Sequence, residues 1–335
     1  MSTKANKQWS LLAVVLLLAT LLTSCGTGGP ATQGSGHEKA IDNLQPISLS
    51  PGQKLQVVAT TNIVADVVKN VGGDRIELVT LMGIGVDPHT YVPTPSDTAA
   101  VHDADVVFAN GAGLEANLDE MLASAGGNAA EIHVSDGIEF LPPPGSAGQD
   151  TSSDGTHAHE EDVDPHVWFS VPNVIHWTQN IEHTLSALDP ENTGYYGQNA
   201  QAYIAKLEPL DAWIQGQVNT IPEAHRKIVT NHPVFGYFAE RYGLEQLGAV
   251  YPISPSASPS AQEVAALQEA IQQYGVPAVF AETTVNPKLA QQVANDTGIK
   301  LVPLYTGSLG GPGSGAETYI EMMRYDVTAI VEALQ

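Results

Sequence analysis

The 335-residue chain is poor in cysteine and in basic residues. Because Cys25 is the only cysteine, no disulfide can form within the chain and no cluster of thiolates can hold a metal ion. Lys and Arg number 13 against 37 Asp and Glu, which gives a formal net charge of −24. This balance argues against nucleic acid as a partner, because the chain has too few basic residues to neutralise phosphates. The acidic charge suits a protein that binds cations, although an acidic surface also serves solubility alone. Because thiolates are excluded, any metal site must use His, Asp and Glu.

The apolar run at residues 11–22 follows two lysines and is too short for a comfortable membrane span. A run of this kind is typical of the hydrophobic region of a signal peptide. It ends in a sequence that resembles the cleavage signal of bacterial lipoproteins, in which a cysteine carries lipid: Leu22-Thr23-Ser24-Cys25-Gly26. We therefore expect residues 1–24 to be a signal peptide and residues 25–52 to be a flexible tether, lipidated on Cys25. The protein would then lie outside the cytoplasm, at the cell surface or in the periplasm, anchored to the bacterial cell membrane.

Removal of the signal peptide leaves about 310 residues, which is long enough for two domains with separate cores. Short β-branched runs alternate in this part with longer amphipathic stretches, a pattern typical of βαβ units and parallel sheets. We expect strands at residues 55–60, 76–81, 106–109, 227–230, 278–281 and 301–304. We expect helices at residues 63–71, 96–102, 171–188, 234–242, 260–274, 287–297 and 316–334. The pattern therefore predicts an α/β protein.

A long amphipathic stretch separates the two halves of this pattern. Asp189 is typical of a helix N-cap and Pro190 of a first helical residue, because proline lacks an N–H that would be unsatisfied there. Apolar residues then recur at helical spacing and predict one helix of roughly 30 residues, about 45 Å long. We therefore expect an N-terminal α/β lobe at residues 53–188, a connecting helix at 189–221 and a C-terminal α/β lobe at 222–335.

Three histidines lie in proline-containing contexts far apart in the chain: Asp87-Pro88-His89-Thr90-Tyr91, Asp164-Pro165-His166-Val167-Trp168 and Asn231-His232-Pro233. The pattern Asp-Pro-His-x-aromatic occurs twice, which is hard to ascribe to chance. Neutral imidazole is the commonest protein ligand for zinc and related ions, and a neighbouring proline removes backbone freedom that binding would otherwise restrict. We predict that His89, His166 and His232 bind one shared metal ion. Asp87 and Asp164 are expected only to organise turns.

Short fragments spread from Leu55 to the C-terminus have a distinctive order and spacing. They are Ala59-Thr60-Thr61-Asn62, the first Asp-Pro-His motif followed by Pro93-Thr94-Pro95-Ser96-Asp97, Asn110-Gly111-Ala112-Gly113-Leu114-Glu115, the second Asp-Pro-His motif, His232-Pro233-Val234-Phe235-Gly236-Tyr237-Phe238 and Phe280-Ala281-Glu282. Together they resemble the metal-specific solute-binding lipoproteins of bacterial ABC importers, in the zinc and manganese group called cluster A-I. The resemblance implies two Rossmann-like lobes with parallel sheets joined by one long rigid α-helix, with the metal site in the cleft between the lobes. It also implies permease and ATPase subunits as partners, and we expect a monomer.

The fourth position of the family's metal site is where this sequence departs from the pattern. Many relatives have an aspartate in a segment that here reads Leu304-Tyr305-Thr306-Gly307-Ser308-Leu309-Gly310, and the aspartate falls on Gly307. Water, Glu282 or an acid from a mobile loop is expected in its place. Glu282 follows a buried strand, and we expect it either to orient an imidazole from behind or to bind the ion as the fourth ligand.

Three imidazoles with at most one oxygen suit zinc better than manganese, which prefers carboxylates, and the Irving–Williams order also favours zinc. Zinc is therefore the predicted ion, with manganese as the alternative. The loop that contains His157-Ala158-His159-Glu160-Glu161-Asp162 resembles the His- and acid-rich insertion of zinc-importing relatives. Two interpretations of it stay open: weak capture of zinc by His157 and His159, or a solvated acidic loop with incidental histidines.

These features predict high-affinity capture of a divalent metal ion outside the cytoplasm and its delivery to an ABC-type membrane importer. A surface adhesin, proposed for some members of the family, is compatible with the lipid anchor and the acidic surface. A zinc hydrolase can also use three histidines and an open water position. Because the chain has no His-Glu-x-x-His or comparable motif, we expect no enzymatic activity.

Overall fold

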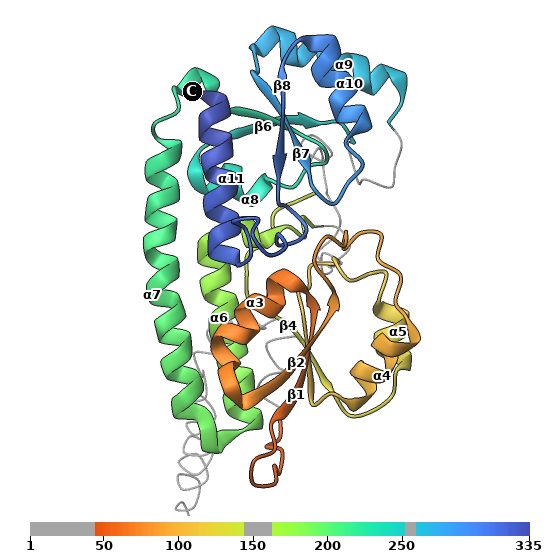
Figure 1. Cartoon of the computed structure of the whole chain (residues 1–335), viewed down its shortest axis with the longest axis vertical. Helices are drawn as coiled ribbons and strands as arrows, with labels where there is room; N and C mark the ends of the chain where they lie inside the picture. Colours follow the sequence, from red (N-terminus) through yellow and green to blue (C-terminus); the bar gives the residue numbers. More distant parts are fainter. Residues whose placement is uncertain (1–43, 144–162, 252–258) are drawn as a thin grey trace, which may run out of the picture. The chain divides into compact units, whose positions relative to one another are not determined.

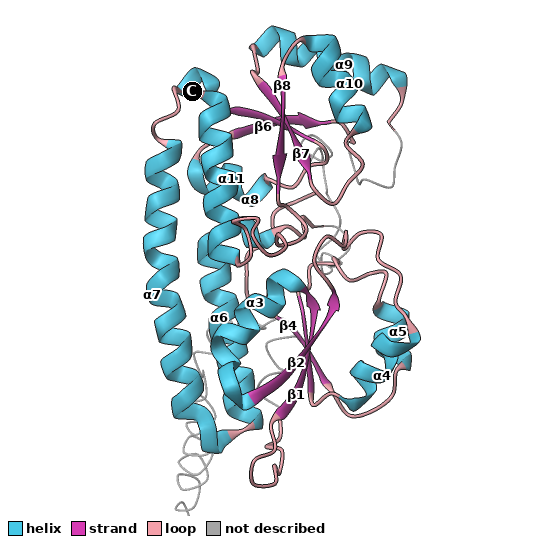
Figure 2. Ribbon diagram, viewed as in Figure 1, coloured by secondary structure: helices cyan, strands magenta, loops and turns pink. Residues whose placement is uncertain are grey.

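The computed structural model describes residues 44–143, 163–251 and 259–335. Within these residues the chain forms two sheets of four parallel strands each, with helices packed against them (Figure 1, Figure 2). The predicted α/β fold with parallel sheets is confirmed. The predicted signal peptide, Cys25, His157 and His159 lie outside the described residues. No helix in the described part of the chain is long and apolar enough to cross a membrane.

The first sheet has the strand order β2-β1-β3-β4. Its strands are β1 (Leu55–Thr61), β2 (Ile76–Met82), β3 (Val106–Ala109) and β4 (Ala130–His133), and its nearby helices are α3 (Asn62–Gly72), α4 (Pro95–Asp103) and α5 (Asp119–Ser124). Along β1, Val57 and Ala59 pack into the core that contains α3, whereas Val58 packs into the core that contains α5. Successive side chains of a strand point to opposite faces, so the run at residues 57–59 of β1 is apolar without alternation because both faces of its sheet are covered.

The second sheet repeats this topology, with the strand order β6-β5-β7-β8. Its strands are β5 (Lys227–Thr230), β6 (Glu245–Ala249), β7 (Ala278–Glu282) and β8 (Lys300–Leu304), and the helices of this part are α8 (Gly236–Tyr242), α9 (Ala261–Tyr274), α10 (Lys288–Thr297) and α11 (Tyr319–Leu334). In both sheets the first strand lies between the second and the third. The strand order therefore reverses beside β1 and β5, which is where open α/β sheets bind ligands at the carboxyl ends of their strands.

A long helix joins the two lobes, as predicted. Helix α7 (Thr193–Val218) packs against α6 (Val171–Leu188) and α3 on the side of the first sheet and against α8 and α11 on the side of the second. The chain enters α7 through a 3-10 turn at Pro190–Asn192, so Pro190 begins a tighter turn than the predicted α-helix. One continuous apolar core contains residues of α3, α6, α7 and α11. Because this core is shared by both lobes, it does not mark where one lobe ends, and the lobe boundaries predicted from the sequence stay predictions.

Candidate metal centre

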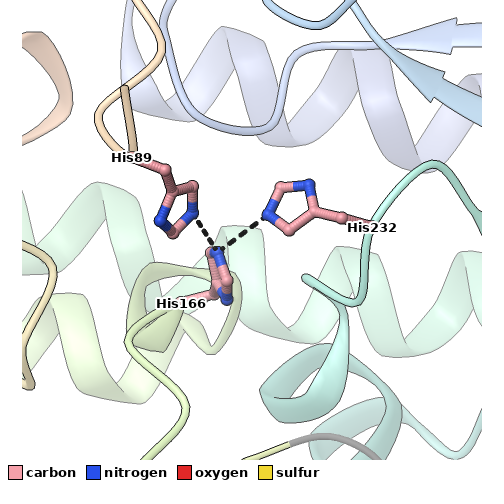
Figure 3. A group of neighbouring side chains, drawn as sticks. All are labelled: His89, His166 and His232. Carbon is pink, nitrogen blue, oxygen red and sulfur yellow. Dashed lines mark hydrogen bonds between the residues drawn. The ribbon is translucent and has the colours of Figure 1, made fainter. Parts of the chain in front are cut away.

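Three histidine side chains from separate loops point toward one another (Figure 3). His89 lies in the loop after β2, His166 lies shortly before α6, and His232 lies two residues after β5. The Nε2 atoms of His89 and His166 are 3.1 Å apart, and those of His232 and His166 are 3.3 Å apart. One ring nitrogen from each histidine lies within 4.8 Å of the other two, a spacing that one metal ion can bridge. The structure thus brings together the three histidines that the sequence singled out.

The repeated Asp-Pro-His motif builds the same local turn twice. The Oδ1 atom of Asp87 accepts a hydrogen bond of 2.9 Å from the backbone N–H of His89, and that of Asp164 accepts one of 3.0 Å from the N–H of His166. Proline between the two residues lacks an N–H of its own and restricts the backbone, which favours this reach across one residue. The predicted role of both aspartates in organising turns therefore has a direct structural counterpart.

Asp164 does more than organise a turn, because its Oδ1 atom also accepts a hydrogen bond of 2.7 Å from Nδ1 of His166. Glu282 makes the corresponding contact with Nδ1 of His232 through Oε1. Each carboxylate accepts a hydrogen bond that Nδ1–H donates, so the lone pair of each ring lies on Nε2, the nitrogen that faces the other histidines. Carboxylates in this position fix the tautomer and orientation of metal-binding histidines. These tautomers are inferred from the hydrogen-bond partners.

Both oxygens of Glu282 are engaged away from the three facing nitrogens. Oε1 accepts from Nδ1 of His232, and Oε2 accepts a hydrogen bond of 2.6 Å from the hydroxyl of Thr306. Because Nδ1 and Nε2 lie on different edges of the imidazole ring, Glu282 sits behind His232 as seen from the centre. This geometry corresponds to the first of its two predicted roles, orientation of an imidazole.

Burial affects the charge of one of the three histidines, His89. Burial, followed by the neighbouring imidazoles of His166 and His232, lowers the pKa of His89 to about 2. Burial raises the pKa of Asp87, with a further contribution from Glu282, against the opposing effect of the hydrogen bond from His89. Near neutral pH, His89 is therefore uncharged and its ring can bind a cation.

Gly307, where many relatives have an aspartate, lies beside the loop that carries His89. A Cβ atom built on Gly307 would be 3.1 Å from Cδ of Pro88 and 3.8 Å from Oγ1 of Thr284. In the described parts of the chain, the group of potential ligands contains no fourth His, Cys, Asp or Glu. The candidate centre is therefore made of nitrogen atoms alone in this part of the protein.

Two residues that support the centre were not predicted, Trp168 and Thr306. The indole N–H of Trp168 donates a hydrogen bond of 3.0 Å to the carbonyl oxygen of Thr306, and its ring lies edge-on to that of His166 with centroids 5.4 Å apart. The aromatic residue two positions after His166 was visible in the repeated motif. Its partner was not, because the two residues are 138 positions apart.

Two lobes of parallel sheet, with converging imidazoles from the loops of both, define a two-lobed metal-binding protein of the solute-binding type. The family follows from comparison with known proteins. The chain belongs to the family described as zinc-uptake complex component A, periplasmic (ZnuA), whose model matches residues 57–333.

Curated relatives and solved structures agree with this membership. The chain is 33% identical over 322 residues to the manganese-binding lipoprotein MntA of Halalkalibacterium halodurans, covering 96% of this chain and 97% of the relative. It is 31% identical over 337 residues to the manganese ABC transporter substrate-binding lipoprotein PsaA of Streptococcus pneumoniae, covering 98% and 99%. The structure of the periplasmic zinc binding protein TroA from Treponema pallidum matches with a TM-score of 0.75 and 30% identity over 84% of this chain and 99% of that one. The location predicted from the N-terminus, outside the cytoplasm and anchored to the membrane, agrees with these findings.

Proposed function

We propose that this protein captures a divalent metal ion outside the cytoplasm, zinc in preference to manganese, and delivers it to the permease and ATPase subunits of an ABC importer. His89, His166 and His232 bind the ion through Nε2, and Glu282 orients His232 from behind. Family membership supports the transport role, and the geometry of the three rings supports the choice of ligands.

The facing lone pairs of His166 and His232 carry this proposal. Their Nδ1 atoms donate to Asp164 and Glu282, so neither Nε2 atom, 3.3 Å apart, bears a proton. Two lone pairs at this distance repel each other. A cation between them converts this repulsion into attraction. Both histidines are almost fully buried, with 5% and 2% of their surface exposed.

The all-nitrogen ligand set is the reason for choosing zinc. Zinc–nitrogen bonds of about 2.0–2.1 Å in a tetrahedron place ligand nitrogens roughly 3.3–3.4 Å apart, close to the 3.1 and 3.3 Å between the Nε2 atoms. Imidazole also ranks zinc above manganese in the Irving–Williams order. Manganese is the second candidate, because the names of MntA and PsaA specify that metal.

The remaining parts of the proposal rest on the sequence. Lipid on Cys25 anchors the protein, residues 25–52 give it reach from the membrane, and His157 and His159 catch zinc weakly near the main site. The protein works as a monomer. The name of PsaA describes a component of an ABC transporter, and we propose neither an enzymatic activity nor an adhesin role for this chain.

Metal competition on the purified, unlipidated chain tests the proposal. We expect one tightly bound zinc ion per chain by elemental analysis, retained when manganese is present at equal concentration. Alanine at His89, His166 or His232 should abolish tight binding. Alanine at His183, an exposed histidine of α6, is the matched control and should leave binding unchanged. Unchanged zinc binding after replacement of two of the three histidines would refute the ligand set, and preferential loading with manganese would refute only the choice of metal.

A further inference from the structure

The segment Tyr305–Leu309, between β8 and α11, contacts both lobes beside the three histidines. The backbone N–H of Tyr305 donates to the buried carboxyl of Asp326 in α11, at 2.9 Å. Further along, the N–H of Leu309 donates to Oδ1 of Asn62, at the start of α3, at 2.8 Å. The segment is therefore held at one end by the second lobe and at the other end by the first.

Thr306 is the residue of this segment that reaches the candidate ligands. It is 2% exposed, and its hydroxyl donates the 2.6 Å hydrogen bond to Oε2 of Glu282, which is 4% exposed. The other carboxylate oxygen of Glu282 accepts from Nδ1 of His232. A carboxylate that accepts hydrogen bonds through both oxygens has a defined orientation. If one buried oxygen loses its hydrogen-bond donor, that oxygen is destabilised, and the carboxylate rotates toward another donor.

The backbone of the same residue makes contact with the other lobe. Its carbonyl oxygen accepts the hydrogen bond from the indole of Trp168, whose own carbonyl oxygen accepts a 2.7 Å hydrogen bond from the hydroxyl of Tyr319. Since Trp168 packs edge-on against His166, Thr306 joins the surroundings of one ligand histidine to those of another. The position of Thr306 is thereby fixed by contacts with both lobes, independently of the hydrogen bond between its hydroxyl and Glu282.

We propose that Thr306 is a positioning residue of the metal centre. Its hydroxyl orients Glu282 so that Oε1 accepts from Nδ1 of His232, which leaves the Nε2 lone pair of His232 directed at the ion. Thr306 does not touch the ion itself. The consequence for metal affinity rests on the proposed function, whereas the consequence for the His232 tautomer does not.

The test compares Thr306→Val, which keeps the shape and removes the hydroxyl, with Thr306→Ser, which keeps the hydroxyl. We expect valine to lower zinc affinity about 10- to 100-fold, the usual range for the loss of such supporting contacts, and serine to restore most of it. Thr184→Val is the matched control, because the hydroxyl of Thr184 is also buried but donates to a carbonyl of its own helix, that of Asn180. It should leave zinc affinity unchanged.

A second measurement uses the metal-free protein. Nitrogen-15 spectra of the histidine rings, with the His232 signals assigned from a His232→Ala variant, report which ring nitrogen carries the proton. We expect Nδ1–H for His232 in the wild type and in Thr306→Ser, and a mixture of tautomers in Thr306→Val. An unchanged tautomer in Thr306→Val, or a loss of zinc affinity that serine does not restore, would overturn the assignment. If the wild-type chain binds no metal, the proposed function fails, while the ring signals still decide the role of Thr306.

Discussion

Replacement of Gly236 by alanine should weaken both folding and metal binding, through the position of one buried carboxylate. A Cβ atom on Gly236 would lie 2.4 Å from Oδ2 of Asp164, about 1 Å closer than an ordinary nonbonded contact. Asp164 is 1% exposed. Its other oxygen, Oδ1, accepts hydrogen bonds from the backbone N–H of His166 at 3.0 Å and from Nδ1 of the His166 ring at 2.7 Å. The carboxylate therefore cannot move away without releasing His166.

The expected magnitude follows from two opposing effects. Gly→Ala usually stabilises by about 0.4–1 kcal/mol through the unfolded chain, whereas an overpacked contact costs about 1–3 kcal/mol. Because the overlap at Gly236 is large, we expect a net loss of about 1–2 kcal/mol in the free energy of unfolding. Zinc affinity should fall about 10- to 100-fold, since His166 loses its fixed orientation.

Chemical unfolding of the metal-free protein and zinc competition titrations measure the two effects. Gly216→Ala in α7 is the matched control, because a Cβ atom there meets nothing within 4 Å. It should stabilise the protein by about 0.5–1 kcal/mol and leave zinc affinity unchanged. If Gly236→Ala behaved like Gly216→Ala in both measurements, the position of Asp164 would not control His166.

Three further predictions concern other parts of the chain. Gly307→Asp adds an oxygen donor beside the loop of His89 and should raise manganese affinity relative to zinc in competition titrations, whereas Gly311→Asp, where a Cβ atom meets nothing within 4 Å, should not. Burial raises the pKa of Asp326 well above its ordinary value. The native state thus keeps a proton that the unfolded state releases, so stability falls by about 1.4 kcal/mol per pH unit between the two pKa values. Asp326→Asn should remove this fall, as measured by unfolding between pH 4 and 8. Deletion of residues 146–162 should leave the tight zinc site intact in titration calorimetry and remove any weaker binding event; loss of the tight site would instead make an acid of this segment the fourth ligand.

The strands that the sequence predicted are those with strong apolar character, and each lies within one residue of its predicted bounds. Two edge strands were missed, β4 and β6, because an edge strand is covered on fewer sides and needs fewer apolar residues. Glu245–Ala249 contains Glu, Gln and Gly, and Ala130–His133 contains Glu and His. No periodicity distinguishes such segments from loops.

The start of the last helix shows a signal that was present and not used. Residues 316–334 were predicted to be helical, but α11 begins at Tyr319, because the side chain of Thr318 accepts from the N–H of Glu321 and the two form a capping box. The Thr-x-x-Glu spacing was legible in the sequence.

The candidate ligands were predictable, whereas their support was only partly so. His89 and His166 stood out through a repeated local pattern, and His232 through the proline beside it. The contacts of Thr306 with Glu282 and Trp168 join residues 24 and 138 positions apart through a hydroxyl and a backbone carbonyl. Neither group leaves a pattern in the amino-acid sequence, because every residue has a carbonyl and many have a hydroxyl. Such contacts become visible only once the fold has placed them.

The three converging histidines also have a consequence for the resistance of the chain to unfolding and proteolysis. They join positions 77 and 66 residues apart, in a protein whose single cysteine leaves it without an internal disulfide. An ion bound by all three acts as a reversible crosslink between the lobes, and at a free concentration 1,000 times the dissociation constant it adds about 4.1 kcal/mol to the free energy of unfolding. Exposed to proteases outside the cytoplasm, the loaded protein would outlast the empty one, so metal supply would set how long each molecule survives.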